Sequence, residues 1–293
     1  MKIIITGSLG HISKPLTQEL VAKGHTLSVI SSNPQKQEAI RNLGAEAAIG
    51  SLSDTDFLSQ TFTGADAVYC MIPPNYDHPD QMVYYQETGK SYRQAILRTG
   101  VQRVVCLSSY GAHLPSGTGF IRGSYFVEQI LNTIPDILLT HVRPTFFYYN
   151  LLGFIDMIKT AGFIGSVYGG DDRLTMVSPR DIATAIAEEL EKTMNTEAIR
   201  YVSSDDLTCS EAAAILGKAI GRPDLEWKTL SEEVVLEALL GRGMPEESAK
   251  KYVELGMAIH TGKLRADYDM HPPILGKVRL EAYATEFARV FNS

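Results

Sequence analysis

The chain has 293 residues, of which 44% are hydrophobic and 21% charged, the composition of a globular protein that buries a core. This length allows two ordinary domains, or one large α/β domain with an appendage. Lysine and arginine number 27 against 34 acidic residues, so the formal net charge is −7. An acidic balance argues against a protein devoted to nucleic acid or to anionic membrane, because both need a basic surface field.

Cysteine usage and the apolar runs indicate the compartment. The cysteines Cys70, Cys106 and Cys209 show neither disulfide nor metal-ligand spacing, and we interpret Cys70 and Cys106 as small core hydrophobes. The chain opens on a strand-like apolar run at residues 2–5, without the pattern of a secretory signal. The most apolar stretch, residues 142–165, is interrupted by charged residues, so it is not expected to cross a bilayer. We expect a cytoplasmic protein that needs no metal.

Short apolar runs alternate with amphipathic segments through the first half of the chain. The expected elements, in chain order, are strand 3–5, helix 12–23, strand 27–30, helix 34–43, strand 45–49, helix 54–62, strand 67–71, helix 84–98, strand 104–107, helix 126–131 and strand 137–142. Strands that are apolar throughout indicate a parallel sheet with helices on both faces. Right-handed crossovers then favour a doubly wound, Rossmann-like α/β fold.

The pattern becomes looser after residue 143. A strand is expected at 175–177, a helix at 179–192, a strand returning to the sheet at 200–203, and helices at 210–220, 231–240, 245–257 and 280–291. Hydrophobic spacing predicts that the last helix buries Leu280, Tyr283, Phe287 and Val290. The sequence thus predicts a Rossmann domain at residues 1–150. A smaller, mostly helical region at residues 151–293 is interleaved with its sheet across a soft boundary.

The most informative motif joins the first strand to the first helix and reads Thr6-Gly7-Ser8-Leu9-Gly10-His11-Ile12-Ser13. Gly7 permits the tight turn, Gly10 lets the backbone approach a pyrophosphate, and the helix N-terminus offers N–H groups to phosphates. These features predict dinucleotide binding, against the alternative of a glycine turn in a phosphate-free domain. Ser13 replaces the third glycine of such loops, where we expect modest loosening of helix–strand packing without loss of binding.

The end of the second strand bears on cofactor choice. It reads Ser31-Ser32-Asn33-Pro34-Gln35-Lys36 and lacks the acidic residue that holds a ribose 2′-hydroxyl in NAD-selective sites. Its serine hydroxyls, the Asn33 amide and the Lys36 charge can address a 2′-phosphate, which favours NADP(H) over NAD(H). The alternative is a polar capping turn before the second helix.

Taken in order, these motifs resemble the NmrA-like family of atypical short-chain dehydrogenase/reductases, which are NAD(P)-binding Rossmann proteins. Further matching segments are residues 108–112 after the fifth strand, 127–128, 143–150 after the sixth strand, 211–213 and 219–223. The resemblance implies that the cofactor contacts Thr6, Gly7, Leu9, Gly10, His11, Ile12, Ser31, Ser32, Asn33, Lys36, Ser51, Leu52, Met71, Ile72, Pro73, Ser108 and Ser109. These segments follow strand ends, where open α/β sheets bind ligands.

The chain departs from its relatives at the proton donor. Short-chain dehydrogenases commonly use a Tyr-x-x-x-Lys pair, and the corresponding positions here are Phe120 and Ser124. We place the candidate catalytic tyrosine at Tyr110. Other candidates are His113, Tyr148 and Tyr149. The alternative for each tyrosine, Tyr110 included, is a ring in the core or a pocket wall with a bonded hydroxyl, and for His113 it is a loop histidine. Arg143, after the sixth strand, is expected either in a structural ion pair or at the substrate.

The resulting hypothesis is an NAD(P)H-dependent oxidoreductase that reduces a small hydrophobic, quinone-like or aromatic acceptor. Tyr110, Phe146, Phe147 and Asn150 are the expected substrate residues, and the partner is a small molecule, with the chain acting as a monomer or homodimer. The alternative is an NADP(H)-binding redox sensor without turnover, which the missing pair favours. The same absence disfavours a third possibility, an epimerase or dehydratase of nucleotide sugars.

Overall fold

The computed structural model describes residues 1–75, 78–194 and 197–293. It contains two compact units, each assembled from separate stretches of chain. The first unit comprises residues 1–112, 123–143 and 182–200, and the second comprises residues 113–122, 144–181 and 201–293.

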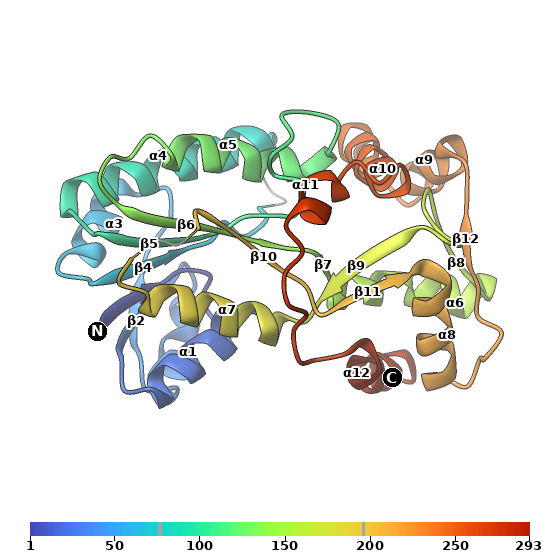
Figure 1. The fold of residues 1–293 in the computed structure, drawn as a ribbon, viewed down its shortest axis with the longest axis horizontal. Helices are drawn as coiled ribbons and strands as arrows, with labels where there is room; N and C mark the ends of the chain where they lie inside the picture. Colours follow the sequence, from blue (N-terminus) through green and yellow to red (C-terminus); the bar gives the residue numbers. More distant parts are fainter. Residues whose placement is uncertain (76–77, 195–196) are drawn as a thin grey trace. The chain divides into compact units, whose positions relative to one another are not determined.

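A seven-stranded sheet organises the first unit (Figure 1). Its strands are β1 (Lys2–Ile5), β2 (Thr26–Ser31), β3 (Glu46–Ile49), β4 (Ala67–Cys70), β5 (Arg103–Leu107), β6 (Leu138–Pro144) and β10 (Ile199–Val202), in the order β10-β6-β5-β4-β1-β2-β3. β1 pairs in parallel with both β2 and β4, so the strand order reverses at β1. The expected doubly wound Rossmann-like fold is confirmed.

Helices cover both faces of this sheet. They are α1 (Ser13–Ala22), α2 (Gln37–Asn42), α3 (Thr55–Phe62), α4 (Gln81–Thr99), α5 (Arg122–Leu131) and α7 (Pro179–Glu191). Figure 1 shows α3, α4 and α5 on one face and α1 and α7 on the other. The core under α3–α5 contains Phe62, Tyr92 and Val127, all fully or almost fully buried.

Side-chain caps define the starts of two helical segments. α4 begins three residues before the expected start because Asp80 Oδ1 accepts the N–H groups of Met82 and Val83. The expected helix at 34–43 opens as a short 3-10 turn, η1 (Pro34–Lys36), in which Asn33 Oδ1 accepts the Gln35 N–H. α5 begins at Arg122 and contains the expected helical residues 126–131.

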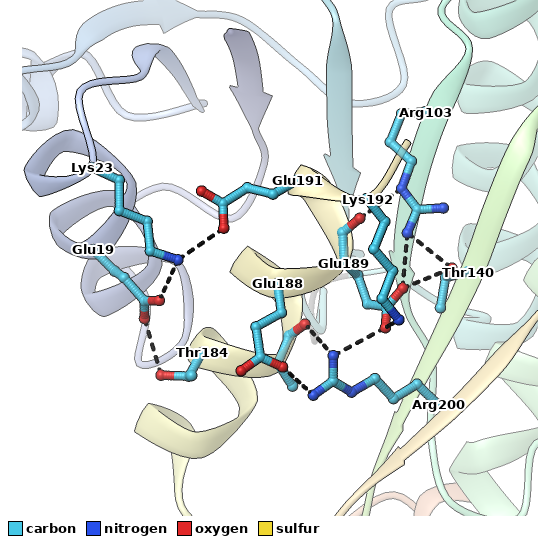
Figure 2. A network of polar contacts seen from close by, with 11 residues as sticks. Glu19, Lys23, Arg103, Thr140, Thr184, Glu188, Glu189, Glu191, Lys192 and Arg200 are labelled. Atoms are coloured by element: carbon cyan, nitrogen blue, oxygen red, sulfur yellow. Dashed lines mark hydrogen bonds and ion pairs between the residues drawn. The ribbon is translucent and has the colours of Figure 1, made fainter. Parts of the chain in front are cut away.

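A polar network attaches α7 to the rest of the first unit (Figure 2). Glu189 is 2% exposed. Its Oε2 lies 2.9 Å from Arg103 Nη2, and its Oε1 lies 3.0 Å from Arg200 Nη1 and 2.6 Å from Lys192 Nζ. Arg103 also donates through Nε to the Glu189 carbonyl at 2.7 Å. On the other side of α7, Lys23 of α1 contacts Glu191 at 2.9 Å. These bonds stabilise the return of residues 182–200 to the sheet.

The second unit combines two small sheets with helices. Its elements are η2 (Gly119–Ile121), β7 (Phe146–Phe147), η3 (Tyr148–Phe154), α6 (Ile155–Ala161), β8 (Ile164–Ser166), β9 (Arg173–Val177), β11 (Asp205–Thr208), α8 (Cys209–Ala219), β12 (Trp227–Thr229), α9 (Glu232–Gly241), α10 (Glu246–His260), α11 (Arg265–Met270) and α12 (Leu280–Phe291). The sheets have the orders β11-β9-β7 and β12-β8. Strands this short leave little pattern in a sequence, and the expected elements did not include four of these five strands.

The last helix has the expected bounds but a shifted buried stripe. Leu280 and Phe287 are buried as expected, together with Ala284 and Phe291. Tyr283 and Val290 are less buried than expected: both are half-buried and pack against the same core. The buried stripe therefore follows a regular spacing of three and four residues, and Tyr283 stacks at its margin on the ring of Tyr148 at 5.3 Å.

Candidate functional site

The glycine loop after β1 has a backbone that only glycine adopts easily. Gly7 has φ +88°, and a Cβ added there would lie 2.5 Å from Ser13 Oγ and 2.8 Å from Met71 Sδ. Gly10 closes the turn by donating its N–H to the Gly7 carbonyl at 3.1 Å. The loop is thus held close to α1 and to the segment after β4.

Ser13 keeps α1 close to β1. Its side chain is 1% exposed, and its hydroxyl donates to the Thr6 carbonyl at 2.8 Å. At this position a hydrogen bond therefore ties the first turn of α1 to the end of β1.

No side chain caps the N-terminus of α1, where the Lys14 N–H donates to the Gly10 carbonyl at 3.0 Å. Its N-cap residue, Ile12, makes no side-chain capping bond, and the first turn contains no acidic residue. Its N–H groups and the positive end of the helix dipole therefore lie beside the exposed Gly10 and His11. These donors and the glycine turn fit the pyrophosphate of a dinucleotide.

Thr6 stabilises the backbone of the segment after β4. It is fully buried, and its Oγ1 accepts the Met71 N–H at 2.7 Å. Tyr92 of α4 donates to the Met71 carbonyl at 2.6 Å. These bonds fix the start of the segment after β4, so Thr6 acts through Met71 and its hydroxyl is committed to the backbone. Tyr92 was not among the residues expected at the site.

The polar side chains at the end of β2 are of two kinds, those bonded within the protein and those exposed. Ser31 is 3% exposed, and its Oγ accepts the Ser8 hydroxyl at 2.9 Å and the Asn33 N–H at 3.2 Å. Ser8 itself has φ +54°, a conformation that this bond helps to hold. Ser32, Asn33 and Lys36 are exposed, so their polar groups are accessible to a ligand.

Residues expected at the cofactor all lie in the first unit, in the segments that follow β1–β5. Their exposure differs. Gly10, His11, Ser32, Asn33, Lys36 and Ser51 are exposed; Gly7, Leu9, Leu52, Met71, Pro73 and Ser109 are half-buried; Thr6, Ile12, Ser31, Ile72 and Ser108 are buried. Ile72 presents its carbonyl to the hydroxyl of Tyr85 on α4 at 3.4 Å, a contact that the sequence did not predict.

A buried ion pair lies behind the segment after β5. Arg143 donates to both carboxylate oxygens of Glu128, through Nε at 2.9 Å and Nη2 at 2.7 Å, and each residue is 3% exposed. Ser108 donates its hydroxyl to the same carboxylate. Of the two expectations for Arg143, the structural ion pair is therefore the one found. Glu128 carries no assignment from the sequence, although a glutamate among apolar helix residues was a signal that it is buried.

The pKa shifts of the buried groups determine which members of this cluster are charged. Burial raises the pKa of Glu128, but the Arg143 bond and the nearby charges of His141 and Arg143 outweigh it, so the pKa lies below the ordinary value of 4.5. Burial lowers the pKa of His141 below 6.5. His141 Nε2 contacts Asn132 Oδ1 at 2.8 Å. The cluster therefore holds one carboxylate, one guanidinium and a neutral imidazole at neutral pH.

The candidate substrate residues belong to both units. Tyr110 lies in the first unit and is 9% exposed. Phe146 and Phe147, half-buried, and Asn150, exposed, lie in the second unit with His113, Phe120 and Tyr149.

Tyr148 is a structural residue. It is fully buried, and its hydroxyl donates to Asp205 and lies 3.0 Å from the Val278 carbonyl. Burial and the Asp205 carboxylate raise its pKa, so Tyr148 is a poor proton donor at neutral pH. The alternative of a buried ring with a bonded hydroxyl is confirmed for this residue.

Other site chemistries find little support. Burial raises the pKa of the Cys70 and Cys106 thiols, as expected for core residues, and that of Cys209 to about 12. Among the described residues no group of three or more histidine, cysteine or acidic side chains could hold a metal ion. No described helix is both long and apolar enough to cross a membrane.

The fold and loop define a doubly wound α/β protein of the Rossmann type with a glycine turn at its switch strand. Residues 1–268 match the NmrA-like family, and the chain belongs to that family.

Three reductases are among the individual proteins that this chain resembles. A (4-alkanoyl-5-oxo-2,5-dihydrofuran-3-yl)methyl phosphate reductase of Streptomyces griseus is 25% identical over 261 residues, 89% of this chain and 88% of its own. The NADPH-dependent quinone oxidoreductase of Escherichia coli, solved with NADPH, superposes with a TM-score of 0.81 at 19% identity, covering 97% of this chain and 99% of its own. The triphenylmethane reductase of a Citrobacter species, solved with NADP(H), gives 0.78 at 20% identity over 98% and 99%. These structures share the fold.

Proposed function

We propose that this protein is an NAD(P)H-dependent oxidoreductase that reduces a small hydrophobic, quinone-like or aromatic acceptor. The observation that carries this function is the N-terminus of α1, which no side chain caps, beside a glycine turn in which a Cβ at Gly7 would be strained and crowded. The family match and the reductase names of the relatives support it.

A bound reduced nicotinamide would supply the hydride. The chain's own residues would hold it in place. The N–H groups at the start of α1 bind the pyrophosphate, and Thr6 and Tyr92 keep the Met71 backbone rigid beneath it. An acidic protein must hold a polyanion by such local donors, because its overall field is unfavourable.

NADP(H) is the preferred cofactor in this proposal. The segment after β2 contains no acidic residue between Ser31 and Lys36, and an acid there would repel a 2′-phosphate. The exposed Ser32 hydroxyl, Asn33 amide and Lys36 ammonium are the groups that would receive it.

Product protonation would not depend on a tyrosine–lysine pair. Phe120 and Ser124 occupy those positions, and Tyr148 is committed to Asp205. Tyr110 stays the candidate donor among the tyrosines. A quinone-like acceptor suits such a site, because solvent can protonate the reduced product.

The second candidate function is a cofactor-binding redox sensor without turnover. The observation that favours it is the phenylalanine at position 120, which carries no titratable group.

A binding and turnover experiment distinguishes these functions. Purified protein is titrated with NADPH and with NADH by fluorescence, and cofactor oxidation is then followed by absorbance against a panel of quinones. We expect tighter binding of NADPH and oxidation dependent on the acceptor. Binding without oxidation by any acceptor would favour the sensor, and binding of neither cofactor would refute both functions.

A further inference from the structure

Ser108 occupies a well-defined position at the carboxyl edge of the sheet. It directly follows β5, and its N–H donates to the Val142 carbonyl of β6 at 2.8 Å, which extends the strand pairing by one residue. The backbone of Ser108 is therefore as rigid as the sheet itself, and the side chain is 7% exposed.

The neighbours of Ser108 determine the direction of its hydroxyl proton. Glu128 is held by two bonds from Arg143, whose guanidinium stays protonated, so this carboxylate is ionised and only accepts hydrogen bonds. The Ser108 hydroxyl donates to Glu128 Oε1. A serine has one hydroxyl proton, so the lone pairs of Oγ are all that Ser108 offers to a further partner.

The strand order indicates which half of a dinucleotide reaches Ser108. The glycine loop follows β1, the segment suited to the adenosine ribose follows β2, and β4 and β5 lie on the other side of β1. A dinucleotide that crosses the sheet edge with its pyrophosphate at β1 places its two halves on opposite sides of that strand. The nicotinamide riboside would then be held on the side of β1 where β4 and β5 end.

We propose that Glu128 and Arg143 position Ser108 as an obligate hydrogen-bond acceptor, and that Ser108 receives an N–H or O–H group from the nicotinamide riboside of the cofactor. Glu128 and Arg143 are positioning residues, since they act through Ser108. A serine in this state cannot donate to the carbonyl of an acceptor substrate. The assignment rests on the proposed function because it requires a bound dinucleotide.

The first measurement is equilibrium binding of oxidised NADP⁺, which needs no turnover. Ser108→Ala is expected to weaken binding about 10-fold, the effect of one lost hydrogen bond in a buried site. Ser91→Ala removes another buried hydroxyl, on α4, which bonds only to backbone carbonyls among the described contacts, and should leave binding unchanged. Adenosine 2′,5′-bisphosphate lacks the nicotinamide riboside, so its affinity should be equal for wild type and Ser108→Ala.

The donor is located with a cofactor analogue. The acetylpyridine analogue of NADP⁺ has a methyl group in place of the carboxamide NH₂. If the NH₂ is the donor, Ser108→Ala no longer weakens binding of this analogue. If a ribose hydroxyl is the donor, the 10-fold loss persists.

The positioning role is tested by replacing the ion pair as a whole. Removing Glu128 alone would leave Arg143 buried and uncompensated, so the test variant is Glu128→Leu/Arg143→Met, which keeps the site apolar and neutral. We expect it to fold and to bind NADP⁺ more weakly than wild type but more tightly than Ser108→Ala, because Oγ can still accept a hydrogen bond while its proton is no longer held by Glu128. If this variant does not fold, Glu128→Met/Arg143→Leu replaces it, which likewise leaves no buried charge, with the same expected weakening. Wild-type NADP⁺ affinity in the folded double variant would refute the positioning role.

Two results would overturn the assignment. One is wild-type affinity for NADP⁺ in Ser108→Ala, and the other is an equal loss of affinity for adenosine 2′,5′-bisphosphate, which would indicate general disruption. If the wild-type protein binds neither NADP⁺ nor the bisphosphate, the proposed function fails as well. If it binds both and Ser108→Ala has no effect, only the role of Ser108 fails.

Discussion

Gly7→Ala should damage both stability and cofactor binding, through two separable effects. A residue with a Cβ at φ +88° pays about 1–2 kcal/mol for the left-handed conformation. The new methyl group would also lie 2.5 Å from Ser13 Oγ and 2.8 Å from Met71 Sδ, and overpacking of this kind costs roughly 1–3 kcal/mol. Together, the free energy of unfolding should fall by about 2–5 kcal/mol.

Gly24→Ala is the matched control. Gly24 follows α1, has φ +84°, and has no atom within 4 Å of an added Cβ. This variant should therefore show the conformational cost alone, about 1–2 kcal/mol. The difference between the two variants measures the clash in the glycine loop.

The assay is urea unfolding of both variants, followed by NADPH titration of the folded proteins. Gly24→Ala should bind NADPH like wild type, whereas Gly7→Ala should bind far more weakly because its turn is displaced from α1. Adding Ser13→Ala should return part of the lost stability, since it removes the nearer clashing atom. Equal destabilisation by both glycine variants would refute the close contact on which this reasoning depends.

Three further predictions follow from the ion pairs and the segment after β2. Glu189→Gln, which leaves the buried Arg103 without its carboxylate, should lower the free energy of unfolding in urea by about 3–5 kcal/mol. Arg98→Ala, whose own side chain is 53% exposed, should lower it by under about 1 kcal/mol, and similar losses in the two variants would contradict the burial argument. Acidification should lower the free energy of unfolding in two stages. The pKa of His141 is lowered in the folded protein, so stability falls as the pH drops below the ordinary histidine pKa of 6.5. The pKa values of Glu128 and Glu189 are also lowered, so the stability that these carboxylates contribute is lost as the pH falls through 4.5 and below, and a pH series of unfolding curves without these two stages would contradict the prediction. Lys36→Gln should weaken NADPH binding several-fold while leaving NADH binding unchanged, and equal effects on both cofactors would exclude a 2′-phosphate contact.

Local patterns were sufficient to predict the elements of the first unit. Apolar runs alternate with helical periodicity up to residue 142, and the predicted strands at 3–5, 27–30 and 104–107 all lie in the sheet. The glycine loop could be predicted equally well, because its conformation depends on adjacent residues. Helix starts were less accurate, since a cap such as Asp80 belongs to the polar residues that precede the hydrophobic pattern.

Long-range contacts limited the prediction of the site. Ser108 was a candidate, but its hydroxyl depends on Glu128, twenty positions later, and on Arg143 beyond that. Tyr148 was a candidate donor until its contact with Asp205, 57 positions away, showed its hydroxyl to be committed. Such partners are brought together by the order of the strands and not by spacing along the chain.

The sequence by itself determined the fold class, the glycine turn and the family, because hydrophobic period and backbone freedom are properties of neighbouring residues. Only the tertiary structure decided which polar groups of the site are still available to a ligand. A hydroxyl or a carboxylate has few hydrogen bonds to offer, and folding commits those of Thr6, Ser31, Ser108 and Tyr148 to protein partners. What remains at the sheet edge is a set of backbone donors, a few exposed side chains and, at Ser108, a lone pair.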